Sequence, residues 1–175
     1  MSYTQIFVVR ENGDVDDYVR IGNAGRGALN IWMKLREVYE VQEDSPISFN
    51  KTWKLYNSGT LEDFEDITLG TTFDRVVVRK KNLLTVASSF DKFFQKYQET
   101  SSQEQADVLR RMNEQEKDCL GVCWNQTSVN ADVWNYSPSC EHEEERPYNI
   151  YKDGSFWFLF QDSKDGETPA LDQPQ

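Results

Sequence analysis

The clearest structural signal in the sequence is the dipeptide Asn12-Gly13, which lies between two segments rich in β-branched and aromatic residues. Both central positions of a two-residue hairpin turn need a positive φ, which Asn and Gly adopt at little cost. The sequence therefore predicts an antiparallel hairpin with strands at 3–10 and 15–21. One face of such a sheet must be covered by other elements of the chain.

Further strand signals occur later in the chain. The segment 73–79 contains three consecutive valines, a pattern that is typical of a central strand buried on both faces. The segments 148–151 and 155–160 flank a Lys-Asp-Gly turn signal and predict a second hairpin. The segment 52–56 fits a short strand, and β character returns after Leu120.

Apolar residues recur at helical spacing in three other segments. The predicted helices are 28–40, 88–98 and 102–118. Capping boxes at Ser88 and Ser101 are expected to start the second and third helices, because a serine oxygen there accepts a hydrogen bond from a free backbone amide. Gly121 is expected to end the third helix.

These elements predict the α+β class. The expected fold is a single domain over residues 1–161, with a mostly antiparallel sheet made of two hairpins and a central strand. About three helices pack on one face of this sheet. Residues 162–175 contain few apolar side chains and two prolines, and are expected to form a disordered tail.

The charge balance narrows the possible functions. The chain of 175 residues has 30 acidic and 19 basic side chains, a net charge of −11, which argues against direct nucleic-acid binding. No apolar run is long enough to span a membrane, and no signal-peptide pattern is found. With three cysteines, an odd number, a disulfide framework is not expected, and the predicted location is the reducing cytoplasm.

All the cysteines and the single histidine fall within one short part of the chain. Cys119, Cys123, Cys140 and His142 have the number and type of donors found in a closed tetrahedral zinc site. The alternative is that Cys119 and Cys123 are small buried apolar residues and that His142 is exposed. A single histidine also excludes three-histidine metal sites and argues against a histidine-based hydrolase.

A glycine-rich stretch follows the first predicted hairpin. Gly22, Gly25 and Gly27 precede a predicted helix, and Arg20 and Arg26 lie beside them in the sequence. A helix N-terminus with free amides and nearby arginines can bind a phosphate. The spacing matches neither the dinucleotide fingerprint nor a P-loop, and a glycine turn that relieves backbone strain is the alternative.

Two clusters of carboxylates are candidates for binding a partner. They are Glu62, Asp63, Glu65 and Asp66, and Glu141, Glu143, Glu144 and Glu145. Runs of acid often form a solvated face, which is the competing interpretation. A dense acidic surface attracts basic partners, including the nucleic-acid channels of other proteins.

Three functional hypotheses remain open, and none assigns a catalytic residue. The preferred one is a non-enzymatic acidic protein-interaction module, in its specific form an inhibitor of a nucleic-acid-binding protein, of the viral anti-defence or host-modulation type. The expected partner is a protein with a basic surface, and no direct contact with nucleic acid or membrane is expected. The alternatives are a small phosphate-binding enzyme that uses the glycine turn and an adaptor domain stabilised by zinc.

Overall fold

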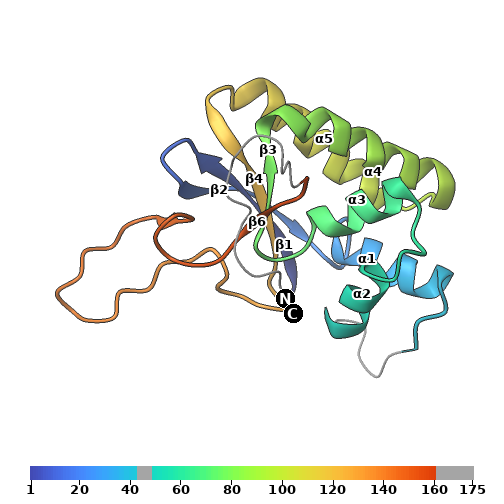
Figure 1. Ribbon diagram of the computed structural model, residues 1–175, viewed down its shortest axis with the longest axis horizontal. Coiled ribbons are helices and arrows are strands. Elements are labelled where there is room, and N and C mark those ends of the chain that lie inside the picture. Colours follow the sequence, from blue (N-terminus) through green and yellow to red (C-terminus); the bar gives the residue numbers. More distant parts are fainter. Residues whose placement is uncertain (43–48, 161–175) are drawn as a thin grey trace.

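The predicted first hairpin is confirmed by the computed structural model, which describes residues 1–42 and 49–160 (Figure 1). Strands β1 (Tyr3–Arg10) and β2 (Asp14–Gly22) pair antiparallel. The turn between them passes through Gly13, whose φ is 92°. The prediction of a positive φ at both turn positions is wrong for Asn12, which is not left-handed. The Gly13 amide donates to the Arg10 carbonyl at 2.9 Å, so Glu11 and Asn12 are the central residues of the turn and Gly13 follows them as its left-handed residue.

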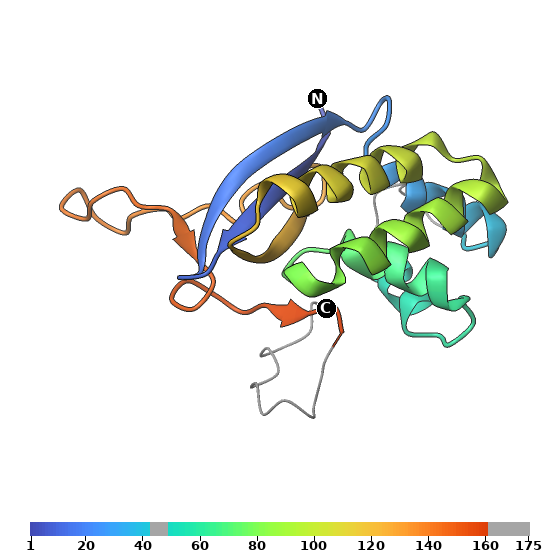
Figure 2. The same cartoon turned by 90° about the horizontal axis from the view of Figure 1, so that it is seen from above.

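Four further strands complete a six-stranded sheet in the order β5-β2-β1-β4-β3-β6. The added strands are β3 (Val76–Arg79), β4 (Cys119–Gln126), β5 (Tyr148–Asn149) and β6 (Trp157–Phe158). All neighbouring pairs are antiparallel except β3 and β6, which are parallel. The sheet is strongly curled into a half-barrel, and the fold is α+β (Figures 1 and 2).

Five α-helices lie in the described residues, together with the short 3-10 turn η1 (Lys80–Asn82). They are α1 (Leu29–Val38), α2 (Phe49–Tyr56), α3 (Asp63–Thr71), α4 (Leu83–Tyr97) and α5 (Thr100–Gln115). The helices gather on one side of the sheet, which we call the helix face (Figure 2). The predicted covering of one face by helices is therefore confirmed, with α2 and α3 added to the three expected helices.

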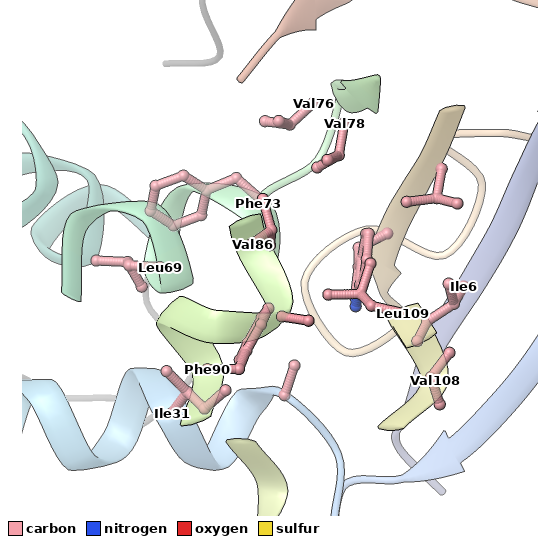
Figure 3. Packing of buried hydrophobic residues seen from close by; sticks show 14 of the residues in the cluster. Ile6, Ile31, Leu69, Phe73, Val76, Val78, Val86, Phe90, Val108 and Leu109 are labelled. Carbon is pink, nitrogen blue, oxygen red and sulfur yellow. The ribbon is translucent and has the colours of Figure 1, made fainter. Parts of the chain in front are cut away.

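The main core lies between the helix face and the helices (Figure 3). Ile6 and Val8 of β1 meet Leu109 of α5 and Phe90 of α4 there, and all four side chains are fully buried. Six aromatic rings gather beside α2 in the same core: Trp32, Phe49, Trp53, Tyr56, Phe73 and Trp157. Rings of this size each remove a large apolar area from water, so this cluster stabilises the docking of α2.

A second, smaller core covers the opposite side of the sheet, which we call the loop face. Phe7, Val77 and Cys123 point into it, and Trp134 from the loop after β4 closes it. The Trp134 indole Nε1 donates a hydrogen bond to the Trp124 carbonyl at 2.8 Å. Because Val77 lies in this core while its two neighbouring valines lie in the main core, β3 is buried on both faces, as predicted.

The predicted second hairpin is wrong. Strand β5 pairs with β2 at one edge of the sheet, and β6 pairs with β3 at the other edge. The chain does turn at this position, since the Lys152 and Asp153 amides both donate hydrogen bonds to the Asn149 carbonyl. The two edges approach each other because the sheet curls, and the short segment 150–156 then runs from one edge to the other.

Several predicted element boundaries also need correction. Residues 52–56 belong to α2 and not to a strand. Helix α4 begins at Leu83, and Ser88 lies inside it, where its hydroxyl donates to the Leu84 carbonyl at 3.1 Å. Helix α5 is capped by Glu99, whose side chain accepts from the Ser101 amide.

The predicted end of the third helix is wrong as well. Helix α5 ends at Gln115, and Gly121 lies within β4. A Cβ atom at Gly121 would stand 2.1 Å from the Val78 carbonyl oxygen. Glycine is therefore needed there for the close approach of β3 and β4. The predicted tail at 162–175 lies outside the described residues.

Candidate functional site

The most exposed part of the described chain is the segment 136–147, which we call the acidic arm. It follows the buried Val133 and Trp134, projects away from the helices, and returns to β5 (Figures 1 and 2). Every residue from 137 to 147 is exposed. The arm contains one of the two predicted acidic clusters, Glu141, Glu143, Glu144 and Glu145.

The bend of the arm is held by one of these glutamates. The Glu143 carboxylate accepts hydrogen bonds from the Ser139 amide at 2.8 Å, the Ser139 hydroxyl at 3.0 Å and the Tyr136 hydroxyl at 2.8 Å. These bonds favour the charged form, and the Ser139 amide contributes most to lowering the pKa of Glu143. Glu143 therefore shapes the arm and has little capacity left for a partner.

The base of the arm is tied to the rest of the molecule by Arg146. Its guanidinium forms two bonds to the Asp153 carboxylate, at 2.6 and 2.5 Å, and stacks 3.7 Å from the centre of the Tyr136 ring. Asp153 also accepts from the Asn149 amide of β5 at 2.8 Å. Bidentate pairing fixes the orientation of an arginine, so the arm leaves the sheet edge in a defined direction. The Arg146 bond is the main reason that the pKa of Asp153 is lowered.

Three glutamates of the arm have no such role. The side chains of Glu141, Glu144 and Glu145 form no hydrogen bond or ion pair with any described residue. Exposed charges without an internal partner are free to meet an opposite charge on another molecule. The structure thus separates the predicted cluster into one bracing residue and three available carboxylates.

The second predicted acidic cluster, on α3, is less available. Glu62 is exposed but pairs with Lys96 at 2.6 Å, and it caps α3 together with Glu65. Asp63 is exposed, and Asp66 is partly buried, which raises its pKa. The prediction that Glu65 binds a partner is wrong, because its side chain is completely buried.

Glu65 instead joins three helices in the interior. Its carboxylate accepts hydrogen bonds from the hydroxyls of Tyr39 and Tyr97 and from the Glu62 amide, and the Lys96 ammonium lies 3.5 Å away. Burial alone would raise the pKa of Glu65, but the hydrogen bonds from Tyr39, Tyr97 and the Glu62 amide and the charge of Lys96 together lower it. This carboxylate is a structural link between α3, the end of α1 and α4.

The predicted zinc ligands are not brought together. Cys119 is buried at the helix face and Cys123 at the loop face, while Cys140 and His142 are exposed on the acidic arm. The two strand cysteines lie on opposite faces because β4 carries an irregularity opposite Val9 and Arg10. Within residues 1–42 and 49–160, no group of three or more His, Cys, Asp or Glu side chains is placed to hold a metal ion.

The predicted phosphate site is filled by the protein's own groups. At the start of α1, the Ala28 amide donates to the Thr4 hydroxyl at 2.8 Å, and the Leu29 amide donates to the Asn23 side chain at 3.4 Å. Arg26 pairs with Glu104 at 3.4 Å, and Arg20 extends from the strand, opposite Gln5. The helix N-terminus therefore presents no free amide from Ala28 or Leu29 to an anion.

The glycines of this turn have a structural role. A Cβ atom at Gly27 would stand 2.0 Å from the Asn23 side-chain oxygen, which reaches back toward α1. Gly22 and Gly25 have no such crowding within 3.4 Å. Gly27 thus permits the close packing that lets Asn23 cap the helix, which agrees with the alternative interpretation of this stretch.

One unusual residue was missed in the sequence. Asp74 is 9% exposed, its Oδ1 has no hydrogen-bond partner among the described residues, and burial raises its pKa to about 7. The next residue, Arg75, has a φ of 65°, which is rare for a residue with a side chain. The only signal in the sequence is an acidic residue between Phe73 and the valine run. Asp74 is therefore a source of pH-dependent stability.

Comparisons with protein-family models, with curated protein sequences and with solved structures find no match. None of the helices in the described ranges has the length and apolar character that a membrane crossing requires.

Proposed function

We propose that this protein is a non-enzymatic interaction module and that its acidic arm binds a basic surface on a partner protein. The observation that carries the proposal is the exposed arm with three carboxylates, Glu141, Glu144 and Glu145, that have no partner within the described chain. The net charge of −11 adds a long-range attraction toward a basic surface.

The internal bonds of the arm support this function. An interaction segment that is already ordered loses less conformational entropy when it binds. Glu143 and Arg146 fix the bend and the base of the arm, so the three free glutamates are presented from a defined scaffold. Exposed Tyr151 lies on the connection that follows β5, and it offers an aromatic contact near the base of the arm.

The specific form of the proposal is inhibition of a nucleic-acid-binding protein. A channel that binds phosphates is lined with Lys and Arg, and a projecting segment with several exposed carboxylates has the opposite charge. The arm is formed by a single excursion of the chain that projects from the edge of the sheet (Figure 2).

The proposal is tested by affinity capture with the full chain, at rising salt, using wild type and the variant E141Q/E144Q/E145Q. The control E11Q/E40Q/E114Q removes the same number of charges from exposed positions on the body. We expect the arm variant to lose at least about four-fifths of the captured partner, and the control to retain most of it. Short duplex DNA should release the partner if the arm occupies a nucleic-acid channel.

Two results would overturn the proposal. Equal capture by the arm variant and the control would mean that the arm is not the binding surface. Capture that is unaffected between low and high salt would show that charge does not drive recognition. Release by salt but not by DNA would reject the inhibitor version and leave the acidic interaction module in place.

A further inference from the structure

The outer edge of β2 is open over most of its length. Strand β5 pairs only with Asp14 and Val15 of β2, and β1 occupies the other side. Residues 16–21 therefore have no strand on their outer side within the described chain, and Figure 2 shows β2 as the outermost strand there. An open edge presents unpaired backbone groups to which another strand can add.

This open edge carries two charges that have no oppositely charged partner among the described residues. Asp16 pairs with Arg10 at 2.8 Å, but Asp17 and Arg20 are exposed and form no ion pair there. Directly opposed residues of antiparallel strands lie on the same face of a sheet. Since Asp17 lies opposite Phe7 and Arg20 opposite Gln5, both charged side chains are on the loop face.

A bulge sets the faces of the other residues. The register of β1 and β2 shifts between Ile6 and Phe7, so that Tyr18 and Val19 both pack against the main core on the helix face. Asp16 and Ile21 lie on the helix face as well, opposite Val8 and Thr4. Along the open edge, the loop face therefore carries only Asp17 and Arg20.

We propose that two copies of this chain associate by antiparallel pairing of β2 with β2 across a two-fold axis. The one register that pairs all six residues 16–21 also places side chains of the same face opposite each other at every position. It pairs Asp16 with Ile21, Asp17 with Arg20, and Tyr18 with Val19 of the second copy. Two-fold symmetry forms each pair twice, so the aspartate of each copy meets the arginine of the other.

The bulge favours a second copy over an unrelated strand. A regular strand pairs across the bulge of β2 only by leaving one residue there without an opposite partner, as β1 leaves Tyr18. In the proposed register the bulge of one copy lies opposite the bulge of the other, so both strands have the same irregularity at the same place. The paired segment is short and we expect weak association, with a dissociation constant of roughly 10–100 µM.

Charge exchange tests the pairing. Asp17→Arg and Arg20→Asp each place like charges opposite each other twice, and each should weaken self-association by at least about tenfold. An equimolar mixture of the two variants should form a heterodimer, because two arginines of one chain then face two aspartates of the other. The measurement is sedimentation equilibrium of the full chain from roughly 1 µM to 1 mM.

Matched controls separate this effect from net charge. Asp63→Arg and Lys92→Asp make the same charge changes at exposed positions on α3 and α4, and they should leave self-association nearly unchanged. A wild-type chain that stays monomeric to millimolar concentration would overturn the proposal. So would a dimer that the exchanges at 17 and 20 do not weaken, or a mixture that fails to associate.

Discussion

At the scale of single residues, two buried carboxylates have opposite hydrogen-bonding environments. Glu65 is surrounded by donors, whereas Asp74 has an oxygen without a hydrogen bond and lies beside Gln126, whose side-chain nitrogen also lacks one. The sequence could not distinguish these cases. The glutamate lies in an acidic run that resembles a solvated face, and its donors Tyr39 and Tyr97 are distant in the chain.

Glu65→Ala is expected to destabilise the fold by about 3 kcal/mol, because two tyrosine hydroxyls and a lysine lose a buried acceptor. Tyr39→Phe, which removes one donor only, should cost about 1 kcal/mol. The pKa of Glu65 is lowered in the folded state, so its contribution is present above the unfolded pKa and lost as pH falls through the folded pKa. Urea unfolding at neutral and acidic pH measures both effects, and equal costs for the two variants would contradict this account.

Asp74 should give the opposite pH dependence. Its folded pKa of about 7 lies above the usual value of 3.8, so the folded state binds the proton more tightly. Stability is then lost as pH rises from about 4 through 7, by on the order of 2 kcal/mol between pH 5 and pH 8. Asp74→Asn is expected to remove that loss and to be more stable than wild type at pH 8. A variant no more stable than wild type at pH 8 would contradict the assignment.

At the scale of helices and strands, sequence patterns predicted the structure correctly where the interacting residues lie close together in the chain. The Asn12-Gly13 turn fixes both the position and the pairing of the first hairpin. The turn at 152–154 also forms, but the pairing of its flanking segments depends on the curl of the whole sheet, which no local pattern encodes. The predicted start of a helix at Ser88 is wrong for a similar reason. Leu83 and Val86 are buried against the rest of the protein, so α4 begins at Leu83, before Ser88.

Gly121→Ala tests the close approach of two strands. The added methyl would collide with the Val78 backbone, so we expect a loss of about 3 kcal/mol through displacement of β3 from β4. The matched control is Gly22→Ala at the end of β2, where nothing lies within 4 Å of the new Cβ, and where the change should stay within about 0.5 kcal/mol. Thermal unfolding of both variants gives the comparison, and similar losses would show that the contact with Val78 is unimportant.

At the scale of the whole molecule, the spacing of apolar residues along the sequence was enough to predict the α+β class and the covering of one face of the sheet by helices. The curl of the sheet and the second core on the loop face did not, because they depend on Trp134 and on contacts between distant segments. The acidic run at 141–145 was visible in the sequence. Its division into a bracing Glu143 and three free carboxylates needed the positions of Tyr136 and Ser139.

The central claim is that the acidic arm contacts a basic partner. Amide hydrogen exchange of the full chain, with and without a partner recovered by salt-sensitive capture, tests it most directly. We expect the partner to slow exchange within residues 136–147 and to leave the amides of α4 and α5 unchanged. Slower exchange elsewhere on the surface, with the arm unaffected, would contradict the account.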